Sequence, residues 1–169
     1  ALANAETYVA GDFNGGPVTF YDTLEQVQGS GAPTVGITRD VTELIESEGT
    51  ELTLTFDVDG AIPEDGLLVY VNNDTRGSLG EFDVFNAEIS GASFPTINGT
   101  ASGFYTRLFE DDATIKVAVF DETTNPEIPA ADALEGVEDF TFTLVPSGDY
   151  AVDAAAASVD ITIKDTPDS

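Results

Sequence analysis

The sequence predicts an all-β protein built as a β-sandwich. Short segments in which apolar and polar residues alternate recur from residue 52 onward, as half-buried strands require. Turn residues separate these segments, and Gly and Thr are abundant throughout. Helical periodicity is nearly absent, and the best helix candidate is one short stretch within a loop, residues 130–134. Several short strands joined by such turns are typical of a sandwich.

Five segments carry the strand pattern most clearly. In the first, LTLTFDV, every second residue is apolar, so one face of the strand is apolar and the other polar. The second, LLVYV, is more continuously apolar and is predicted to be a central strand. The other three return to the alternating pattern. The full set comprises residues 52–58, 67–71, 115–119, 140–144 and 159–163.

The chain is predicted to have two parts, an N-terminal extension of residues 1–32 and a sandwich of residues 33–169. The extension offers one strand, Val18–Tyr21, and ends in a Gly-rich stretch that indicates a linker or an exposed turn. It is too small to bury a core alone. We therefore expect its strand to pair with a sheet edge, either of its own sandwich or of a neighbouring molecule. The chain contains no Met, which predicts a processed protein or an excised fragment.

Acidic residues dominate the composition. The chain has 32 Asp and Glu against 5 Lys and Arg, a formal net charge of -27. Such self-repulsion weakens a compact fold unless cations or high salt offset it. The charge excludes nucleic acid and anionic membrane surfaces as expected partners, because both require Lys and Arg. Two explanations remain open and are compatible: specific metal sites, or a solvated surface of the kind found in halophilic proteins.

Missing residue types exclude several functions. With no Cys and no His, the chain has no disulfide, no thiolate or imidazole ligand for zinc, and no Ser-His or Cys-His nucleophile. There is no Trp and no aromatic cluster to form a sugar platform, so a carboxylate-pair glycosidase is not expected. We therefore expect no enzyme activity. No apolar run approaches the roughly 20 residues of a membrane span. Two triplets, Asn73-Asp74-Thr75 and Asn98-Gly99-Thr100, match the N-glycosylation pattern, which also arises by chance.

Carboxylates gather at predicted strand ends. An acidic pair beginning at Asp121 ends one strand, the turn Glu135-Gly136-Val137-Glu138-Asp139 opens the next, and the last strand runs into Asp165. Strands can deliver such residues to one end of a sheet. A hard cation that takes about 6–8 oxygen ligands, above all Ca²⁺, suits a cluster of this kind.

Four stretches resemble, in order, the Calx-β domain, the calcium-binding module of sodium/calcium exchangers and of many bacterial surface proteins. The resemblance covers about four-fifths of the chain. This chain departs from the family pattern in having Val after Asp83 and about ten extra residues at 123–134. The matching stretches are residues 46–50, residues 69–71 followed by Asp83, residues 121–122 with 135–142, and residues 159–165.

The resemblance implies an immunoglobulin-like antiparallel β-sandwich of about seven strands that binds Ca²⁺ at one end. The alternative interpretation of any single acidic residue, in a chain this acidic, is a solvated loop carboxylate that binds no metal. Glu122 and Asp168 are secondary candidates. The ligands that the resemblance implies are Glu48, Asp83, Asp121, Glu135, Glu138 and Asp165.

Two functional hypotheses follow. The first is a non-enzymatic calcium-binding module of an extracellular or cell-surface protein, in which Ca²⁺ rigidifies the domain or its junction with a neighbouring domain for adhesion or structure. The second is a self-assembling subunit of an extracellular filament or surface layer, whose copies are joined by N-terminal strand exchange and calcium bridging. The position of residues 1–32 distinguishes the two hypotheses.

Overall fold

The computed structural model describes residues 31–73, 75–121 and 136–168. The chain divides into two compact units, residues 1–32 and 33–169, and the sandwich is the second. The predicted strand Val18–Tyr21 and the predicted helix at residues 130–134 lie outside the described residues. Both stay predictions.

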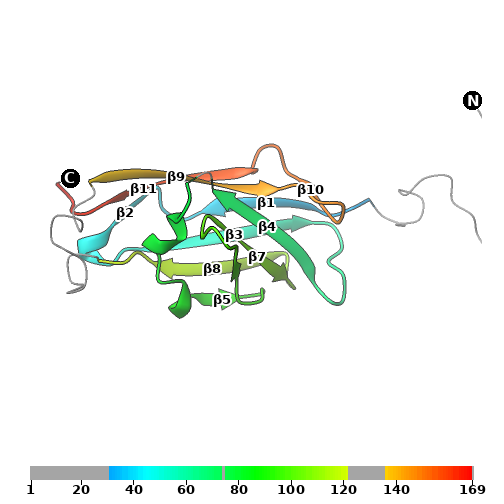
Figure 1. Cartoon of the computed structure of the whole chain (residues 1–169). Coiled ribbons are helices and arrows are strands. Elements are labelled where there is room, and N and C mark those ends of the chain that lie inside the picture. Colours follow the sequence, from blue (N-terminus) through cyan, green and yellow to red (C-terminus); the bar gives the residue numbers. More distant parts are fainter. Residues whose placement is uncertain (1–30, 74, 122–135, 169) are drawn as a thin grey trace, which may run out of the picture. The chain divides into compact units, whose positions relative to one another are not determined.

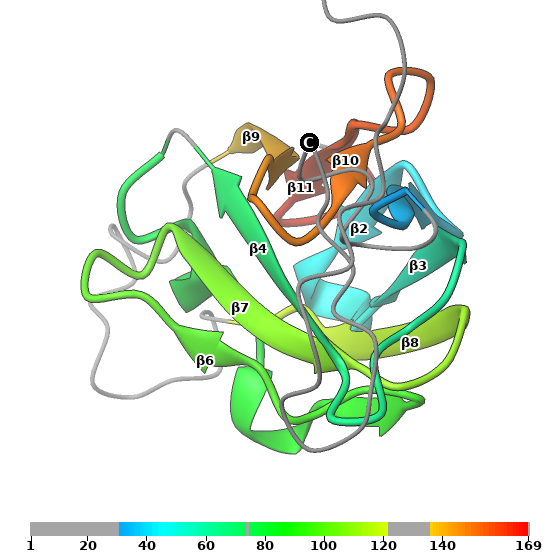
Figure 2. The ribbon, with the colours of Figure 1, turned by 90° about the vertical axis from the view of Figure 1, so that its right-hand side faces the viewer.

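Two β-sheets pack face to face in the second unit, which confirms the predicted all-β sandwich (Figures 1 and 2). Across the first sheet lie β10 (Ala151–Val152), β1 (Thr34–Arg39), β3 (Glu51–Asp59), β8 (Asp112–Ala118) and β5 (Glu88–Ser90). Across the second lie β2 (Glu43–Ile45), β11 (Ser158–Lys164), β9 (Val137–Val145), β4 (Leu67–Asn73), β7 (Gly103–Leu108) and β6 (Thr96–Ile97). In the described part of the chain, the connections contain three short 3-10 helices: η1 (Glu46–Glu48), η2 (Ser78–Glu81) and η3 (Val84–Asn86).

Seven of the described strands have six or more residues, which agrees with the expected number. The remaining strands, β10, β5, β2 and β6, have two or three residues and form the four sheet edges. Edge strands this short leave little free backbone for another chain to pair with. β4 lies between β9 and β7, which confirms the predicted central strand.

Pairing is antiparallel, as predicted, except at two edges. There β10 runs parallel to β1, and β2 runs parallel to β11. Both exceptions arise where the chain changes sheets. After β1 the chain leaves the first sheet and adds β2 to the second, so β2 meets β11 and not a hairpin partner. Hairpins give antiparallel pairs, whereas a strand that crosses over is free of that constraint.

The core lies between the sheets and is formed by the inward-facing residues of the long strands. On β3, Leu52, Leu54 and Phe56 are buried, as their alternation predicts. On β9, Phe142 is 1% exposed and its ring meets Phe82 edge to face, with centroids 6.1 Å apart. Burial of each such side chain contributes about 1.5–3 kcal/mol.

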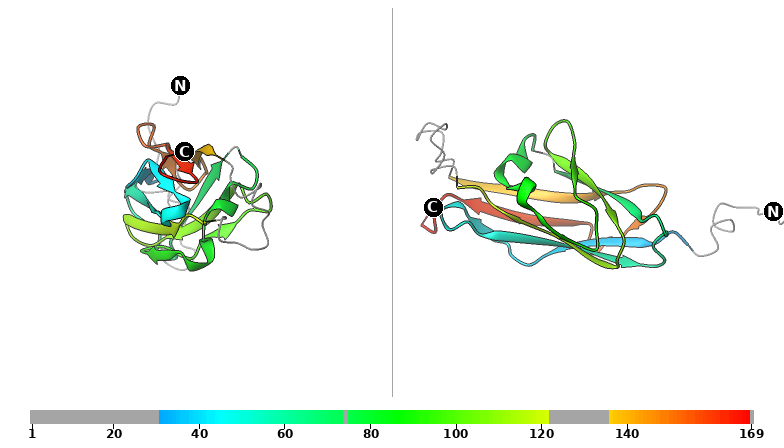
Figure 3. Two further views of the ribbon diagram at one scale, coloured as in Figure 1. Left: turned by 90° about the vertical axis from the view of Figure 1, so that its left-hand side faces the viewer. Right: turned by 90° about the horizontal axis from the view of Figure 1, so that it is seen from below.

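The two ends of the sandwich differ in what they contain. At one end, β3 and β9 begin and β8 and β11 finish (Figures 1 and 3). The backbone N–H of Ser47 donates to the Asp165 carbonyl there (3.1 Å), which joins η1 to the end of β11. We call this end, residues 46–51, 118–121, 136–138 and 164–165, the Asp165 pole. The opposite end, where Thr34 of β1 pairs with Asp59 of β3, is the Asp57 pole; it comprises residues 57–59, 110–112 and 149–153.

Candidate functional site

Carboxylates occupy core-facing positions at the Asp165 pole. On β11, Val159, Ile161 and Ile163 are buried between the sheets. The same alternation reaches Asp165, which is 5% exposed although it is charged. The apolar stripe of the last strand therefore ends in a buried carboxylate. The sequence placed Asp165 at a strand end but did not predict that it continues the buried stripe.

The neighbouring strands end in the same way. On β9, Phe140 is buried and Glu138, two residues earlier on the same face, is half-buried. Glu138 pairs in register with Ile163 of β11. Beyond β8, Val119 is buried and the alternation continues to the half-buried Asp121. By this alternation both predicted ligands fall on the core-facing side, at half-buried positions.

Glu46 belongs to this set, although the sequence analysis did not select it. It is 4% exposed and follows the buried Leu44 of β2 by two residues. The predicted residue, Glu48, lies on η1 with its side chain exposed. The signal that favours Glu46 is the spacing from Leu44. Glu46 begins η1, but Ile45 before it is still extended, so the alternation of β2 reaches Glu46. A strand of three residues is too short to make that signal visible in the sequence.

Asp165 is held in place by hydrogen bonds on both sides. The backbone N–H of Gly136 donates to its two carboxylate oxygens, at N···O distances of 3.2 and 3.0 Å. Its carbonyl accepts from Ser47, as described above. Gly136 has φ of +91°, a left-handed conformation that favours glycine. The turn before β9 is therefore fixed against the end of β11, which positions the carboxylate.

Asp83 has a structural role. Its carboxylate accepts from the backbone N–H and the side-chain amide of Asn86, at 3.3 and 2.7 Å, and so caps η3. Its own N–H donates to the carbonyl of Ala118, at the end of β8 (2.9 Å). This contact brings the backbone of Asp83 beside the Asp165 pole, while its carboxylate serves the cap.

The remaining predicted ligand, Glu135, lies outside the described residues, as does the secondary candidate Glu122. Asp168 is described and exposed. Within residues 31–73, 75–121 and 136–168, no three His, Cys, Asp or Glu side chains are grouped so as to hold a metal ion. The described acids of the pole face inward but do not by themselves complete a coordination shell.

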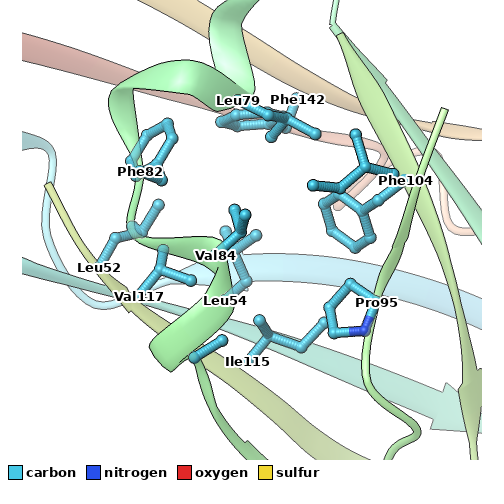
Figure 4. A pocket seen from close by; sticks show the side chains of 12 residues that line it. Leu52, Leu54, Leu79, Phe82, Val84, Pro95, Phe104, Ile115, Val117 and Phe142 are labelled. Atoms are coloured by element: carbon cyan, nitrogen blue, oxygen red, sulfur yellow. The ribbon is translucent and has the colours of Figure 1, made fainter. Parts of the chain in front are cut away.

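The space between the sheets near η2 and η3 contains an apolar cavity of about 30 Å³ (Figure 4). Figure 4 shows Leu54, Phe104 and Phe142 directed toward it from three strands. The lining is apolar, with residues from β3, β6, β7, β8, β9, η2 and η3 and the connections beside them. A cavity this small, without a polar side chain, offers no group for acid–base or nucleophilic chemistry.

In the described part of the chain, no helix has the length and apolar character needed to cross a membrane.

Comparison with known proteins gave structural neighbours only. No protein-family model matches the chain, and no curated protein matches it. One neighbour is the apo form of the Calx CBD1 domain, with a TM-score of 0.38 and 14% identity; the match covers 79% of this chain and 96% of that domain.

Two further neighbours are cohesin complexes. A type I cohesin–dockerin complex from Clostridium thermocellum has a TM-score of 0.36 and 10% identity, and the match covers 79% of this chain and 94% of the other. The third cohesin ScaC with the ScaB dockerin, from Acetivibrio cellulolyticus, has a TM-score of 0.32 and 12% identity, with 79% and 99% covered. These weak similarities do not establish a family, so the Calx-β resemblance stays a prediction.

Proposed function

We propose that this chain is a non-enzymatic calcium-binding β-sandwich module of an extracellular or cell-surface protein, with Ca²⁺ bound at the Asp165 pole. One observation carries the proposal: the core-facing alternation of β8, β9 and β11, and of β2 with η1, ends in a carboxylate each time, at the same pole. These carboxylates are Asp121, Glu138, Asp165 and Glu46.

Carboxylates that lie near one another at one pole repel, whatever other partners each of them has. The net charge of -27 increases that repulsion. A divalent cation between these carboxylates reverses the sign of the interaction. Ca²⁺ fits better than Mg²⁺, because it accepts 6–8 oxygen ligands in flexible geometry, whereas Mg²⁺ demands a smaller octahedral shell.

Each predicted ligand has a place in this proposal. Asp165, Glu138 and Asp121 supply inward carboxylates, and Glu46 joins them. Glu135 is proposed as a further ligand because it directly precedes Gly136, whose N–H already contacts Asp165. Glu48 is the outer member, on an exposed position of η1. Asp83 can contribute a ligand only if its carboxylate gives up its hydrogen bonds from Asn86 and binds the ion instead.

The position of the site supports the module role. β11 finishes at the pole that carries the carboxylates, so an ion there stiffens the residues that follow β11. The alternative, assembly by N-terminal strand exchange, is not favoured by the described edges, because each edge strand has only two or three residues. Residues 1–30 lie outside the described part, so their pairing stays a prediction.

The test is a calorimetric Ca²⁺ titration of the full chain after chelation, with two variants of one strand. Asp165→Asn removes an inward carboxylate of the β11 stripe, and Asp160→Asn removes an exposed outward one on the same strand. We expect Asp165→Asn to weaken binding by about tenfold or more, which corresponds to a loss of at least about 1.4 kcal/mol. Asp160→Asn is expected to bind as the parent does. No calcium binding by the parent, or equal binding by both variants, contradicts the proposal.

A further inference from the structure

The chain contains two N-glycosylation triplets, and their asparagines have different surroundings in the structure. Both lie in one pair of neighbouring loops, since the N–H of Asn73 donates to the Ser102 carbonyl (2.7 Å) and that of Gly77 to the Thr100 carbonyl (3.0 Å). The triplet at Asn73 begins at the last residue of β4, and the triplet at Asn98 lies in the β6–β7 hairpin loop. Their asparagines differ in burial and in the atoms that are free to react.

Asn73 is enclosed. Its side chain is 3% exposed, and its Nδ2 is buried without a hydrogen-bond partner. Its Oδ1 accepts from the N–H of Thr75 at 2.6 Å. The nitrogen that would carry a sugar therefore lies inside the fold, where no glycan has room.

Asn98 presents the opposite arrangement. Its Oδ1 accepts three hydrogen bonds, from the N–H and the hydroxyl of Thr100 (3.1 and 2.9 Å) and from the N–H of Ser102 (3.2 Å). Its Nδ2 forms no hydrogen bond with the described residues and is not among their buried unpaired atoms. Gly99 and Thr100 are exposed. The amide oxygen is thus bound to the threonine of its own triplet. Asn98 is half-buried, where Asn73 is enclosed, and its nitrogen is not among the buried unpaired atoms of the described residues.

We propose that Asn98 is an N-glycosylation site of this protein and that Asn73 is not. In the reaction, Nδ2 attacks the anomeric carbon of an oligosaccharide carried on a lipid pyrophosphate. The new N–C bond forms, the C–O bond to the pyrophosphate breaks, the lipid pyrophosphate leaves with the electron pair, and a base of the transferase takes the amide proton. The proposal requires passage through a glycosylating compartment, in line with the proposed extracellular location, but it does not involve the calcium site.

The experiment is secretion of the full chain from a glycosylating yeast, followed by intact-mass measurement and peptide mapping. Two matched variants remove the hydroxyl of each triplet: Thr100→Ala and Thr75→Ala. We expect one glycan on the parent and on Thr75→Ala, located at Asn98, and its complete loss in Thr100→Ala. A glycan on Asn73, or an unmodified Asn98 in the secreted parent, overturns the proposal.

A second variant guards against a folding defect. Asn98→Asp keeps an acceptor oxygen for Thr100 and Ser102 but lacks the amide nitrogen. Amidase removal of the glycan from the parent leaves the same aspartate at position 98. Asn98→Asp should therefore carry no glycan and melt at the same temperature as the enzymatically deglycosylated parent. Glycan on this variant would contradict the assignment to Asn98. Calcium binding is measured separately, so failure of one proposal leaves the other testable.

Discussion

The two poles of the sandwich both carry acidic residues but place them differently. At the Asp165 pole, Glu46 and Asp165 are 4% and 5% exposed, on positions that continue the core-facing stripes. At the Asp57 pole, Asp57, Asp59 and Asp112 lie on the outer face and are exposed. The number of acids therefore does not distinguish a candidate ligand from a solvated charge, whereas the face of the strand does.

The outward acids of the Asp57 pole fit the halophile-like explanation of the net charge. Asp57 and Asp112 are directly opposite each other in the β3–β8 pair. Like charges in that position are destabilising, and high salt relieves the repulsion. At the Asp165 pole, by contrast, the acids continue the core-facing stripes, and this is the pole where we propose that Ca²⁺ binds. Both explanations of the composition can thus apply to one molecule, each at its own pole.

The poles also differ in how they are closed. At the Asp57 pole, Tyr150 is 2% exposed and its hydroxyl donates to the Val145 carbonyl while it accepts from the N–H of Tyr70 (3.2 Å). A neutral phenol therefore ties the segment after β9 to β4. At the Asp165 pole, a charged carboxylate ties the start of β9 to the end of β11.

The largest expected effect lies between the poles. Phe142→Ala should lower the free energy of unfolding by about 3–5 kcal/mol, because it leaves a cavity beside Phe82 in the core. Phe85→Ala is the matched control, since Phe85 is 83% exposed and its loss should cost less than about 0.5 kcal/mol. Chemical denaturation of both variants gives the two values. Equal losses would show that the core does not lie where the two sheets meet.

Removal of calcium should have the next largest effect. At a free Ca²⁺ concentration 100 times the dissociation constant, binding to the native state alone stabilises it by roughly 2.7 kcal/mol. A chelator should then lower the melting temperature by roughly 5–10 °C for a domain of this size. Scanning calorimetry in moderate salt measures the difference, with Mg²⁺ in place of Ca²⁺ as control. An unchanged melting temperature after chelation would contradict a bound ion.

Tyr150→Phe tests the closure of the Asp57 pole. It removes a hydroxyl whose two partners are the Val145 carbonyl and the Tyr70 N–H, and should cost about 1–2 kcal/mol. Burial raises the pKa of the Tyr150 phenol. Because the unfolded chain ionises first, this tyrosine stabilises the fold below its ordinary pKa of about 10 and loses that contribution as pH rises further. The free energy of unfolding, measured from pH 9 to 11, should therefore fall more steeply with pH in the parent than in the variant.

The smallest effect concerns a single outward acid. Asp57→Asn removes one member of the Asp57–Asp112 pair and should stabilise the fold by about 0.2–1 kcal/mol at low salt. In about 1 M salt the gain should disappear, because the screening length falls to about 3 Å. Thermal unfolding at both salt concentrations checks this. A loss of stability at low salt would mean that Asp57 has a favourable partner, against its assignment as a solvated charge.

The long strands with clean alternation were predictable from the sequence. In β3, β9 and β11 the alternation of apolar and polar residues predicted which side chains are buried. In β4 the continuous apolar run predicted a central strand. The short edge strands were not predicted, because two or three residues cannot show a period of two. β7 was missed for another reason. Its buried face includes the polar Thr106 and its exposed face includes the aromatic Tyr105, so the contrast between the faces is weak.

The candidate residues Asp165 and Glu138 were selected from motifs at strand ends. That Asp165 continues the buried stripe of β11 was not predicted, although the same alternation extends to it. Glu46 is inward because β2 pairs with β11, a contact between residues more than a hundred positions apart. The motif suggested Glu48 instead, two residues further on. The capping role of Asp83 depends on the 3-10 turn that it begins, which no period of the sequence indicates.

Calcium binding after equal charge removal at the two poles shows which pole holds the ion. The double variant Glu138→Gln with Asp165→Asn and the double variant Asp57→Asn with Asp112→Asn each remove two negative charges. Calorimetric Ca²⁺ titration of the chelated full chains, with circular dichroism to confirm folding, gives the result. If Ca²⁺ binds at the Asp165 pole, the first variant loses the calcium-binding transition and the second retains the parent's affinity and stoichiometry. Retained binding in the first variant, or loss in the second, would show that the Asp165 pole is not the calcium site.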